Sequence, residues 1–130
     1  MHSRELTDKA VAIIEEDFAL LEGVHELAEK LGVTDCHLIR AFKADTGISP
    51  GQRLISTRIE VAKLILRHRA YSIETVAQIV GYSGANYFCK VFRRATGMTP
   101  VSYRKLPGPE TALSNRDQLL LETLDRFSHT

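Results

Sequence analysis

The feature that most constrains the fold of this chain is an internal repeat. Within its 130 residues, the segment Thr-Gly-Ile-Ser-Pro at 46–50 returns as Thr-Gly-Met-Thr-Pro at 96–100, an offset of 50 residues. Further matches lie upstream, namely Phe42-Lys43 with Phe92-Arg93, Leu27-Ala28 with Val76-Ala77, and Gly32 with Gly81. A repeat of this length indicates that one supersecondary unit occurs twice within one small domain.

Each copy has the residue order of a helix-turn-helix. An alanine is followed four residues later by a glycine, then by Ser or Thr, and then by an apolar helix. Glycine permits the positive φ of a tight turn, and a hydroxyl side chain favours the N-cap of the next helix. These residues are Ala28, Gly32 and Thr34 in the first copy and Ala77, Gly81 and Ser83 in the second, with Ser72 as a further expected N-cap. Two such units point to DNA as the partner.

The spacing of apolar residues predicts an all-α fold. Apolar side chains recur at steps of three and four, and no segment shows strand-like alternation of any length. The expected helices cover about 5–21, 24–31, 35–44, 50–68, the stretch between Ser72 and Gly81, 85–95, and a short segment around Tyr103. Within a domain of residues 1–105, two helix-turn-helix subdomains, about 5–50 and 72–105, would be joined by a long helix over about 51–69.

Residues 106–130 form an extension outside the repeat. Pro107-Gly108-Pro109 interrupts regular structure, and an apolar stripe then predicts an amphipathic C-terminal helix. The stripe consists of Leu113, Leu120, Leu121, Leu124 and Phe127. This helix either docks back on the domain or offers a face to a partner or a second copy, because its apolar side must be buried somewhere.

Composition and motif spacing argue against several classes of protein. No run reaches the roughly 18 apolar residues of a membrane span, and the N-terminus lacks the apolar stretch of a signal peptide, so we expect a cytoplasmic protein without a membrane partner. Cys36 and Cys89 lack a C-x-x-C spacing and are expected to be free thiols. His25, His37 and His68 show no metal-ligand spacing, so neither a metal nor a cofactor is expected.

The net charge of +1 conceals an uneven distribution. Residues 1–30 carry a net −5, residues 31–105 a net +8 and residues 106–130 a net −2. Positive charge therefore gathers in the segment that contains both repeats, where it suits the phosphates of a nucleic acid. The residues expected on the outer face of the long helix are Arg53, Arg58, Lys63, Arg67 and Arg69.

The helices over 35–44 and 85–95 each place one stripe of side chains opposite their core-facing residues. Helical steps give Cys36, Ile39, Arg40 and Lys43 in one helix and Asn86, Cys89, Lys90 and Arg93 in the other. Arg40 can donate two hydrogen bonds to guanine, Asn86 can pair with adenine, and Lys90 can reach a guanine or a phosphate. The apolar members suit contact with a thymine methyl group. These stripes are therefore the candidate base-reading surfaces.

A second set of side chains is expected to hold the DNA backbone. It consists of Thr34, Lys43, Ser83, Arg93 and Arg94. Hydroxyl and cationic groups near helix ends bind phosphates, which fixes the position of a protein on DNA but does not read sequence. For any one of these residues alone, a solvated surface side chain is the commoner role. Two stripes at equivalent places in matching units favour DNA contact.

Over about residues 6–105 the chain resembles the DNA-binding domain of AraC/XylS-type bacterial transcription regulators. The resemblance rests on Leu27-Ala28 with Gly32, on Leu38-Ile39-Arg40-Ala41-Phe42-Lys43, on Thr46-Gly47-Ile48-Ser49-Pro50, and on Arg58-Ile59 with Ala62 and Leu66. Its most specific part is Val76-Ala77, Gly81-Tyr82-Ser83, Tyr87-Phe88, Val91-Phe92-Arg93 and Gly97-Met98-Thr99-Pro100 with Tyr103-Arg104.

The resemblance implies a sequence-specific regulator without catalysis, commonly an activator that contacts RNA polymerase. The helices over 35–44 and 85–95 would enter adjacent major-groove segments of an asymmetric double-stranded site, about 10 base pairs apart. By position, the base-contacting residues are Cys36, Ile39 and Arg40 in the first unit and Ala85, Asn86, Cys89 and Lys90 in the second. Because most relatives also carry a sensor domain, the chain is either free-standing or a fragment of a longer regulator.

Two other functions stay open at this point. A nucleophilic thiol at Cys36 or Cys89 would make the chain an alkyl-accepting or redox-sensing regulator, since thiolates form near cations and helix N-termini. The apolar stripe of the expected C-terminal helix would instead make the chain a protein-interaction module.

Overall fold

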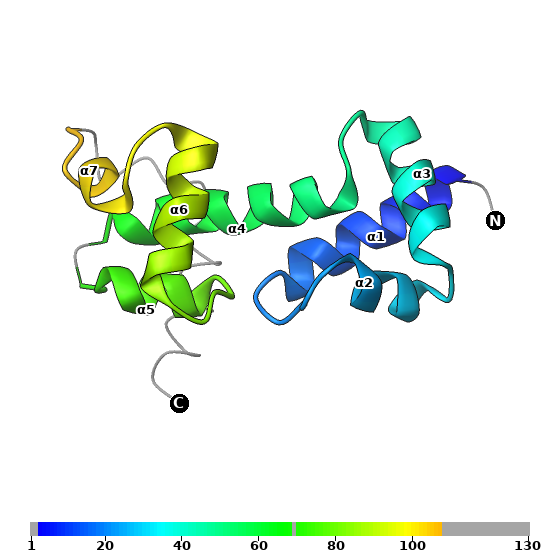
Figure 1. Cartoon of the computed structure of the whole chain (residues 1–130), viewed down its shortest axis with the longest axis horizontal. Coiled ribbons are helices and arrows are strands. Elements are labelled where there is room, and N and C mark those ends of the chain that lie inside the picture. Colours follow the sequence, from blue (N-terminus) through cyan, green and yellow to red (C-terminus); the bar gives the residue numbers. More distant parts are fainter. Residues whose placement is uncertain (1–2, 69, 108–130) are drawn as a thin grey trace. The chain divides into compact units, whose positions relative to one another are not determined.

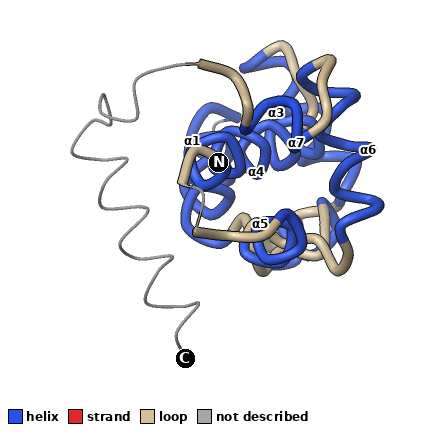
Figure 2. The backbone as a smooth tube through the Cα atoms, turned by 90° about the vertical axis from the view of Figure 1, so that its left-hand side faces the viewer, coloured by secondary structure: helices blue, strands red, loops and turns tan. Residues whose placement is uncertain are grey.

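A computed structural model describes residues 3–68 and 70–107, and every regular element within these residues is an α-helix (Figure 1; Figure 2). The predicted all-α class is confirmed. The helices are α1 (Ser3–Asp17), α2 (Val24–Leu31), α3 (Asp35–Thr46), α4 (Pro50–Leu66), α5 (Ile73–Ile79), α6 (Ala85–Thr96) and α7 (Pro100–Arg104). The C-terminal helix expected around 113–127 lies outside the described residues. None of the helices described is both long and apolar enough to span a membrane.

The chain divides into two compact units, which we call unit 1 (Met1–Arg58) and unit 2 (Ile59–Thr130). The division falls within α4, so the first half of this helix belongs to unit 1 and the second half to unit 2. In unit 1, α1 packs against α3 and α2, while in unit 2, α6 packs against α5 and α7. Each unit thus contains one helix-turn-helix pair, α2 with α3 or α5 with α6.

The core of unit 1 fixes the rotation of α3 about its axis. The buried side chains of α1 include Leu6, Ala10 and Ile14. Those of α2 and α3 are Leu27, Ala28, Leu38, Ala41 and Phe42. Thr7 adds a buried polar link, because its hydroxyl donates to Asp45 Oδ2 at 2.7 Å and so joins α1 to the last turn of α3. With one face of α3 packed in this way, the opposite face must point to solvent.

Unit 2 has an aromatic core. The ring centroids of Phe88 and Phe92 lie 5.7 Å apart, and Tyr82 and Tyr103 extend the chain of rings at 5.7 and 5.6 Å. Tilted and edge-to-face pairs of this kind contribute about 0.5–1.5 kcal/mol each beyond the burial of their area. Because Phe88 and Phe92 belong to α6, these contacts fix the rotation of that helix too.

The repeated segment that begins with Thr-Gly is a junction between two helices. Thr46 Oγ1 lies 2.8 Å from the carbonyl oxygen of Phe42, and Thr96 Oγ1 lies 2.8 Å from that of Phe92. The glycine that follows ends each helix with a φ of 83° or 82°, which side chains with a Cβ rarely adopt. The Ser or Thr before the proline then caps the next helix. The repeated Thr-Gly segment therefore has a structural role, because it ends one helix and begins the next.

Most of the expected caps and turns are confirmed. Gly32 ends α2 in the left-handed region with a φ of 70°, and Gly81 has a φ of 106° after α5. Ser72 caps α5 by accepting the backbone N–H of Thr75 at 3.1 Å. These residues were predicted from local chemistry alone, which suffices where a cap is made within one turn of chain.

The expected N-cap at Ser83 is wrong. Helix α6 begins at Ala85 after Gly84, and no side chain caps its N-terminus. At the offset of 50 residues, Gly84 corresponds to Thr34, whose hydroxyl caps α3 by accepting the N–H of His37 at 3.1 Å. The second copy therefore has a glycine at the cap position, and Ser83 lies one residue too early to replace it.

Helix α1 ends at Asp17, before the expected end near residue 21. Arg58 supplies the reason, because its Nε donates to the carbonyl oxygen of Phe18 at 2.8 Å and its Nη2 donates to that of Leu21. Carbonyl groups at a helix end need such partners. Arg58 was expected on the outer, cationic face of the long helix, and this expectation is wrong, since the residue is only 9% exposed.

In unit 2, Arg104 also donates hydrogen bonds to two distant backbone carbonyl groups. Arg104 of α7 donates from Nε to the carbonyl oxygen of Leu66 at 3.0 Å and from Nη2 to that of Tyr71. Helix α4 accordingly ends at Leu66 instead of near residue 68. Helix α3, by contrast, continues to Thr46 instead of ending near residue 44, because Gly47 provides its C-cap.

Candidate nucleic-acid interface

In unit 1 the structure brings the expected stripe together on the outer face of α3. Cys36, Arg40 and Lys43 are exposed, and Ile39 is 40% exposed although it is apolar. On the other side of the helix, Leu38, Ala41 and Phe42 are buried, as the helical spacing predicts. The stripe thus presents one guanidinium and one ammonium beside two apolar side chains. Such a mixture suits the edge of a base pair and a thymine methyl group.

In unit 2 the corresponding stripe lies on α6 with different chemistry. Asn86, Lys90 and Arg93 are exposed, whereas Cys89 and Ala85 are half-buried. The opposite face consists of Phe88, Val91 and Phe92, all buried. The outer face of α6 is therefore formed mainly by the amide of Asn86 and the cations of Lys90 and Arg93. The half-buried Cys89 adds a small apolar surface. That these stripes touch DNA bases stays a prediction.

Several cations on α3 and α6 are not neutralised by an ion pair within the described residues. Arg40, Lys43, Lys90, Arg93 and Arg94 form no ion pair with any other described residue. By contrast, Arg53 pairs with Glu15 at 3.2 Å and Lys63 with Glu60 at 3.0 Å. The positive charge available to a polyanion is therefore smaller than the sequence count suggests, and in the described part of the chain it includes α3 and α6.

The residues expected to hold phosphates occupy three kinds of position. Lys43 and Arg93 lie in the last turns of α3 and α6, and Arg94 follows Arg93. Thr34 is exposed, and its oxygen is used as the N-cap of α3 while its O–H group is left to donate. Ser83 is exposed in the turn before α6. None of these positions is shielded from an approaching backbone by its own unit.

Sequence reasoning assigned no role to Tyr87, which is 63% exposed on α6. Its ring packs edge-to-face on Tyr82 with centroids 5.7 Å apart. The sequence contained a signal for an exposed Tyr87, because helical spacing does not place it on the same face as the buried Phe88, Val91 and Phe92. An aromatic residue held at the surface beside Asn86 widens the candidate interface of unit 2.

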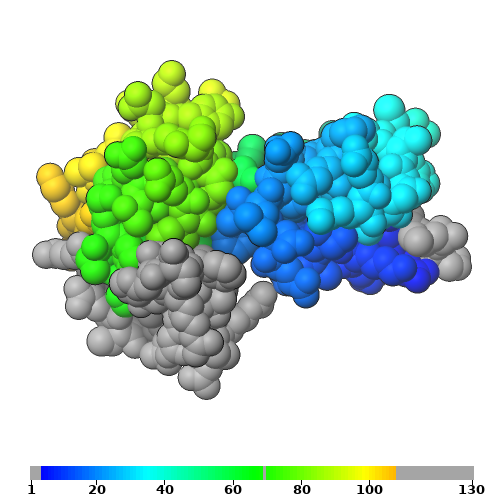
Figure 3. Space-filling model, turned by 90° about the horizontal axis from the view of Figure 1, so that it is seen from below, coloured from blue at the N-terminus to red at the C-terminus, as the bar shows by residue number. Residues whose placement is uncertain are grey.

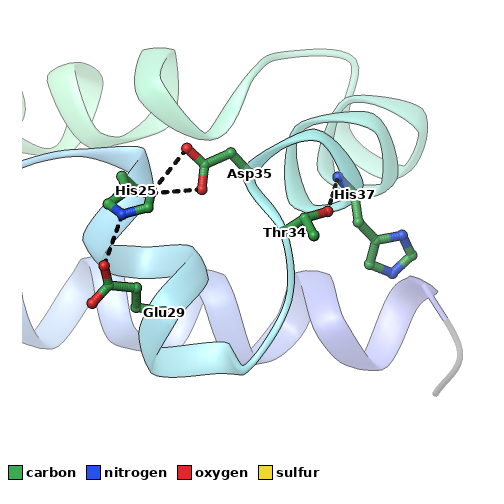
Figure 4. Close-up of polar contacts among 5 residues, drawn as sticks. All are labelled: His25, Glu29, Thr34, Asp35 and His37. Carbon is green, nitrogen blue, oxygen red and sulfur yellow. Dashed lines mark hydrogen bonds and ion pairs between the residues drawn. The ribbon is translucent and has the colours of Figure 1, made fainter.

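Sequence reasoning also missed a charged cluster at the start of α3. His25 of α2 contacts Glu29 on its own helix and Asp35, the first residue of α3 (Figure 4). The hydrogen bond and the charge of Asp35, and then the charge of Glu29, raise the pKa of His25 above the ordinary 6.5. His25 and Asp35 lie ten residues apart on two helices, so helical periodicity does not connect them.

The described residues contain no group of three or more His, Cys, Asp or Glu side chains placed to hold a metal ion. Cys36 is exposed and Cys89 half-buried, and both are free thiols in the structure, as expected. The exposed side chains of α3 and α6 offer hydrogen bonding, apolar contact and positive charge.

Residues 27–106, more than half of the chain, match a family described as a helix-turn-helix domain. The transcriptional activator RhaR of Salmonella arizonae is 31% identical over 105 residues, which cover 80% of this chain and 37% of RhaR. The chain spans about a third of the length of most curated relatives that it matches.

Solved structures agree with this match. The C-terminal domain of AraT, a response regulator from Geobacillus stearothermophilus, superposes with a TM-score of 0.76 at 28% identity, covering 85% of this chain and 92% of that domain. The DNA-binding domain of AdpA, a global transcriptional factor solved in complex with a target DNA, gives 0.68 at 29% identity and covers 75% of this chain and 88% of that domain. This chain thus belongs to the AraC/XylS family of DNA-binding helix-turn-helix transcription regulators.

Proposed function

We propose that this chain reads an asymmetric operator through two short elements about one helical turn apart, with α3 on one element and α6 on the other. The observation that carries the proposal is the contrast between the stripes. Arg40 with apolar neighbours faces outward in unit 1, and Asn86 with Lys90 faces outward in unit 2. Two reading surfaces of different chemistry in one chain favour two different elements over a palindrome.

Individual roles follow from side-chain chemistry. Arg40 would read a guanine and Asn86 an adenine, each through two hydrogen bonds. Cys36, Ile39, Ala85 and Cys89 would contact base edges and methyl groups, and Lys90 a guanine or a phosphate. The residues assigned to phosphates are Thr34, Lys43, Ser83, Arg93 and Arg94. Their contacts would fix the register of the domain without reading sequence.

The proposed regulatory role is activation through contact with RNA polymerase in the bacterial cytoplasm. Its support is the relative RhaR, which is named a transcriptional activator. Because the chain spans 37% of RhaR, we propose that it is the DNA-reading part of such a regulator, with effector sensing assigned to residues outside this chain.

Selection from a random duplex library tests this proposal. The bound pool is sequenced after selection at a fixed salt of about 150 mM, because phosphate contacts make affinity strongly dependent on salt. Enrichment of two different elements about 10 base pairs apart is the expected result. Enrichment of one element would restrict base reading to one unit, and a palindromic pair would contradict the asymmetric site.

A further inference from the structure

One side chain connects the two helices of the helix-turn-helix in unit 1. His25 Nδ1 lies 2.9 Å from Oδ1 and 3.1 Å from Oδ2 of Asp35, and His25 Nε2 lies 2.8 Å from Oε1 of Glu29 (Figure 4). His25 and Glu29 belong to α2, while Asp35 opens α3. Both ring nitrogens therefore face carboxylates, an arrangement in which a doubly protonated ring can donate to both partners.

The other charges near His25 favour the same protonated state. Glu22 and Glu26 line a shallow hollow together with His25 and Glu29. Gly51 of α4, which lies close to the side chain of Val24 at the start of α2, carries no charge. Helix α1 contributes no group within ion-pair distance of His25 among the described residues. His37 of α3 points away from the cluster in Figure 4.

The cluster lies at the place where DNA phosphates are expected to approach. Asp35 stands between Thr34, assigned to a phosphate, and Cys36, assigned to a base. A carboxylate in the first turn stabilises a helix through its dipole, yet it repels a nearby phosphate. Helix α2 and the start of α3 lie at the surface of unit 1, as the blue and cyan region of Figure 3 shows. The side chain of His25 itself is 75% exposed.

We propose that His25 is a positioning residue of the DNA-binding surface: it holds the Asp35 carboxylate and, when protonated, neutralises it, so that the affinity of the chain for DNA rises as pH falls. The proposal rests on α3 entering DNA, as in the proposed function. His25 acts through Asp35 and needs no contact with a base.

The direction of the pH effect follows from linkage. The pKa of His25 is already raised in the free chain, mainly by Asp35, and a nearby phosphate raises it further. DNA binding then takes up protons, and by reciprocity protonation strengthens DNA binding. The affinity gained by protonation is fully present below the raised pKa of His25 in the free chain, and it is lost as pH rises through the still higher pKa of His25 in the DNA-bound chain.

The test measures the Kd of the full chain for a mixed-sequence duplex of about 30 base pairs by fluorescence anisotropy, from about pH 6 to 8.5 at constant ionic strength. Between these limits the wild type is expected to lose about two- to fivefold more affinity than His25→Gln, the range typical of an exposed charge pair. His68→Gln, which alters an exposed histidine outside the cluster, should keep the wild-type profile.

A second variant keeps the test decisive should His25→Gln lose structure. Asp35→Asn should raise affinity more at high pH than at low pH, and adding His25→Gln to it should change nothing further. Parallel profiles for the wild type and His25→Gln, or an Asp35→Asn effect that is equal at both ends of the pH range, would overturn the proposal. Because the duplex carries no selected element, either outcome is independent of whether library selection returns two elements.

Discussion

Arg58 donates from Nε to the backbone carbonyl oxygen of Phe18 at 2.8 Å, across 40 residues of sequence. Its Nη2 donates to the carbonyl oxygen of Leu21 as well, so one buried guanidinium satisfies two backbone groups beyond the end of α1. The guanidinium thereby joins the first half of α4 to the segment that follows α1, the helix that packs against α3 in unit 1. An arginine that looks like a phosphate ligand in the sequence is instead a structural link.

Replacing Arg58 by Ala is therefore expected to reduce stability strongly. The change leaves two carbonyl groups without their donor, and each buried unsatisfied group costs about 1–3 kcal/mol. We expect the free energy of unfolding to fall by about 2–4 kcal/mol, measured by urea denaturation followed by circular dichroism. The matched control is Lys63→Ala, which removes a surface pair with Glu60 on the same helix and should cost about 0.5 kcal/mol or less. A similar small loss for both variants would contradict the structural role of Arg58.

The two glycines that flank α6 give a second matched pair. Gly97 has a φ of 82°, Gly84 has a φ of −152°, and at neither position would an added Cβ meet an atom within 4 Å. Gly97→Ala should therefore destabilise the chain by about 1–2 kcal/mol through backbone strain alone. Gly84→Ala should cost less, about 0.5 kcal/mol, because its backbone conformation suits any residue and only the N-cap preference for glycine over alanine is lost. Equal thermal shifts for the two variants would rule out strain as the cause.

The two arginines in the last turn of α6 are expected to act on phosphates. Each of Arg93→Ala and Arg94→Ala should weaken binding about equally on all DNA sequences and reduce the slope of log K against log salt by about 1. Lys9→Ala is the control, since Lys9 pairs with Glu5 on α1 and should leave the slope unchanged. The measurement is a salt titration of Kd on one fixed duplex. A loss confined to one base position, with an unchanged slope, would instead assign the residue to base reading.

The rotation of α3 and α6 about their axes was predictable from sequence. Helical steps alone place Leu38 and Phe42 together on one side and Arg40 on the other, and the structure buries the first two and exposes the third. Turns made within a few residues, such as Gly32 and the cap at Ser72, were predictable for the same reason. In all these cases the deciding interaction lies within about two turns of chain.

What escaped prediction depends on contacts between distant residues or on an offset of one position. Periodicity treats Arg58 as a surface cation, because it cannot show that carbonyl groups 37 and 40 residues away need donors. The hydroxyl of Ser83 favours an N-cap in the sequence, but Gly84 occupies the N-cap position of α6. The pair of His25 and Asp35 needs the geometry of the turn between α2 and α3, which no spacing rule supplies.

The most direct test of two-element reading combines changes in the protein with changes in the DNA. Kd is measured for the wild type, Arg40→Ala and Asn86→Ala on the selected duplex and on versions with either element scrambled. We expect Arg40→Ala to cost about 1–3 kcal/mol on the selected duplex and to lose most of that effect when the element read by α3 is scrambled. Asn86→Ala should show the same coupling with the other element only. Coupling of both residues to one element, or to neither, would contradict the account that each unit reads its own part of an asymmetric site.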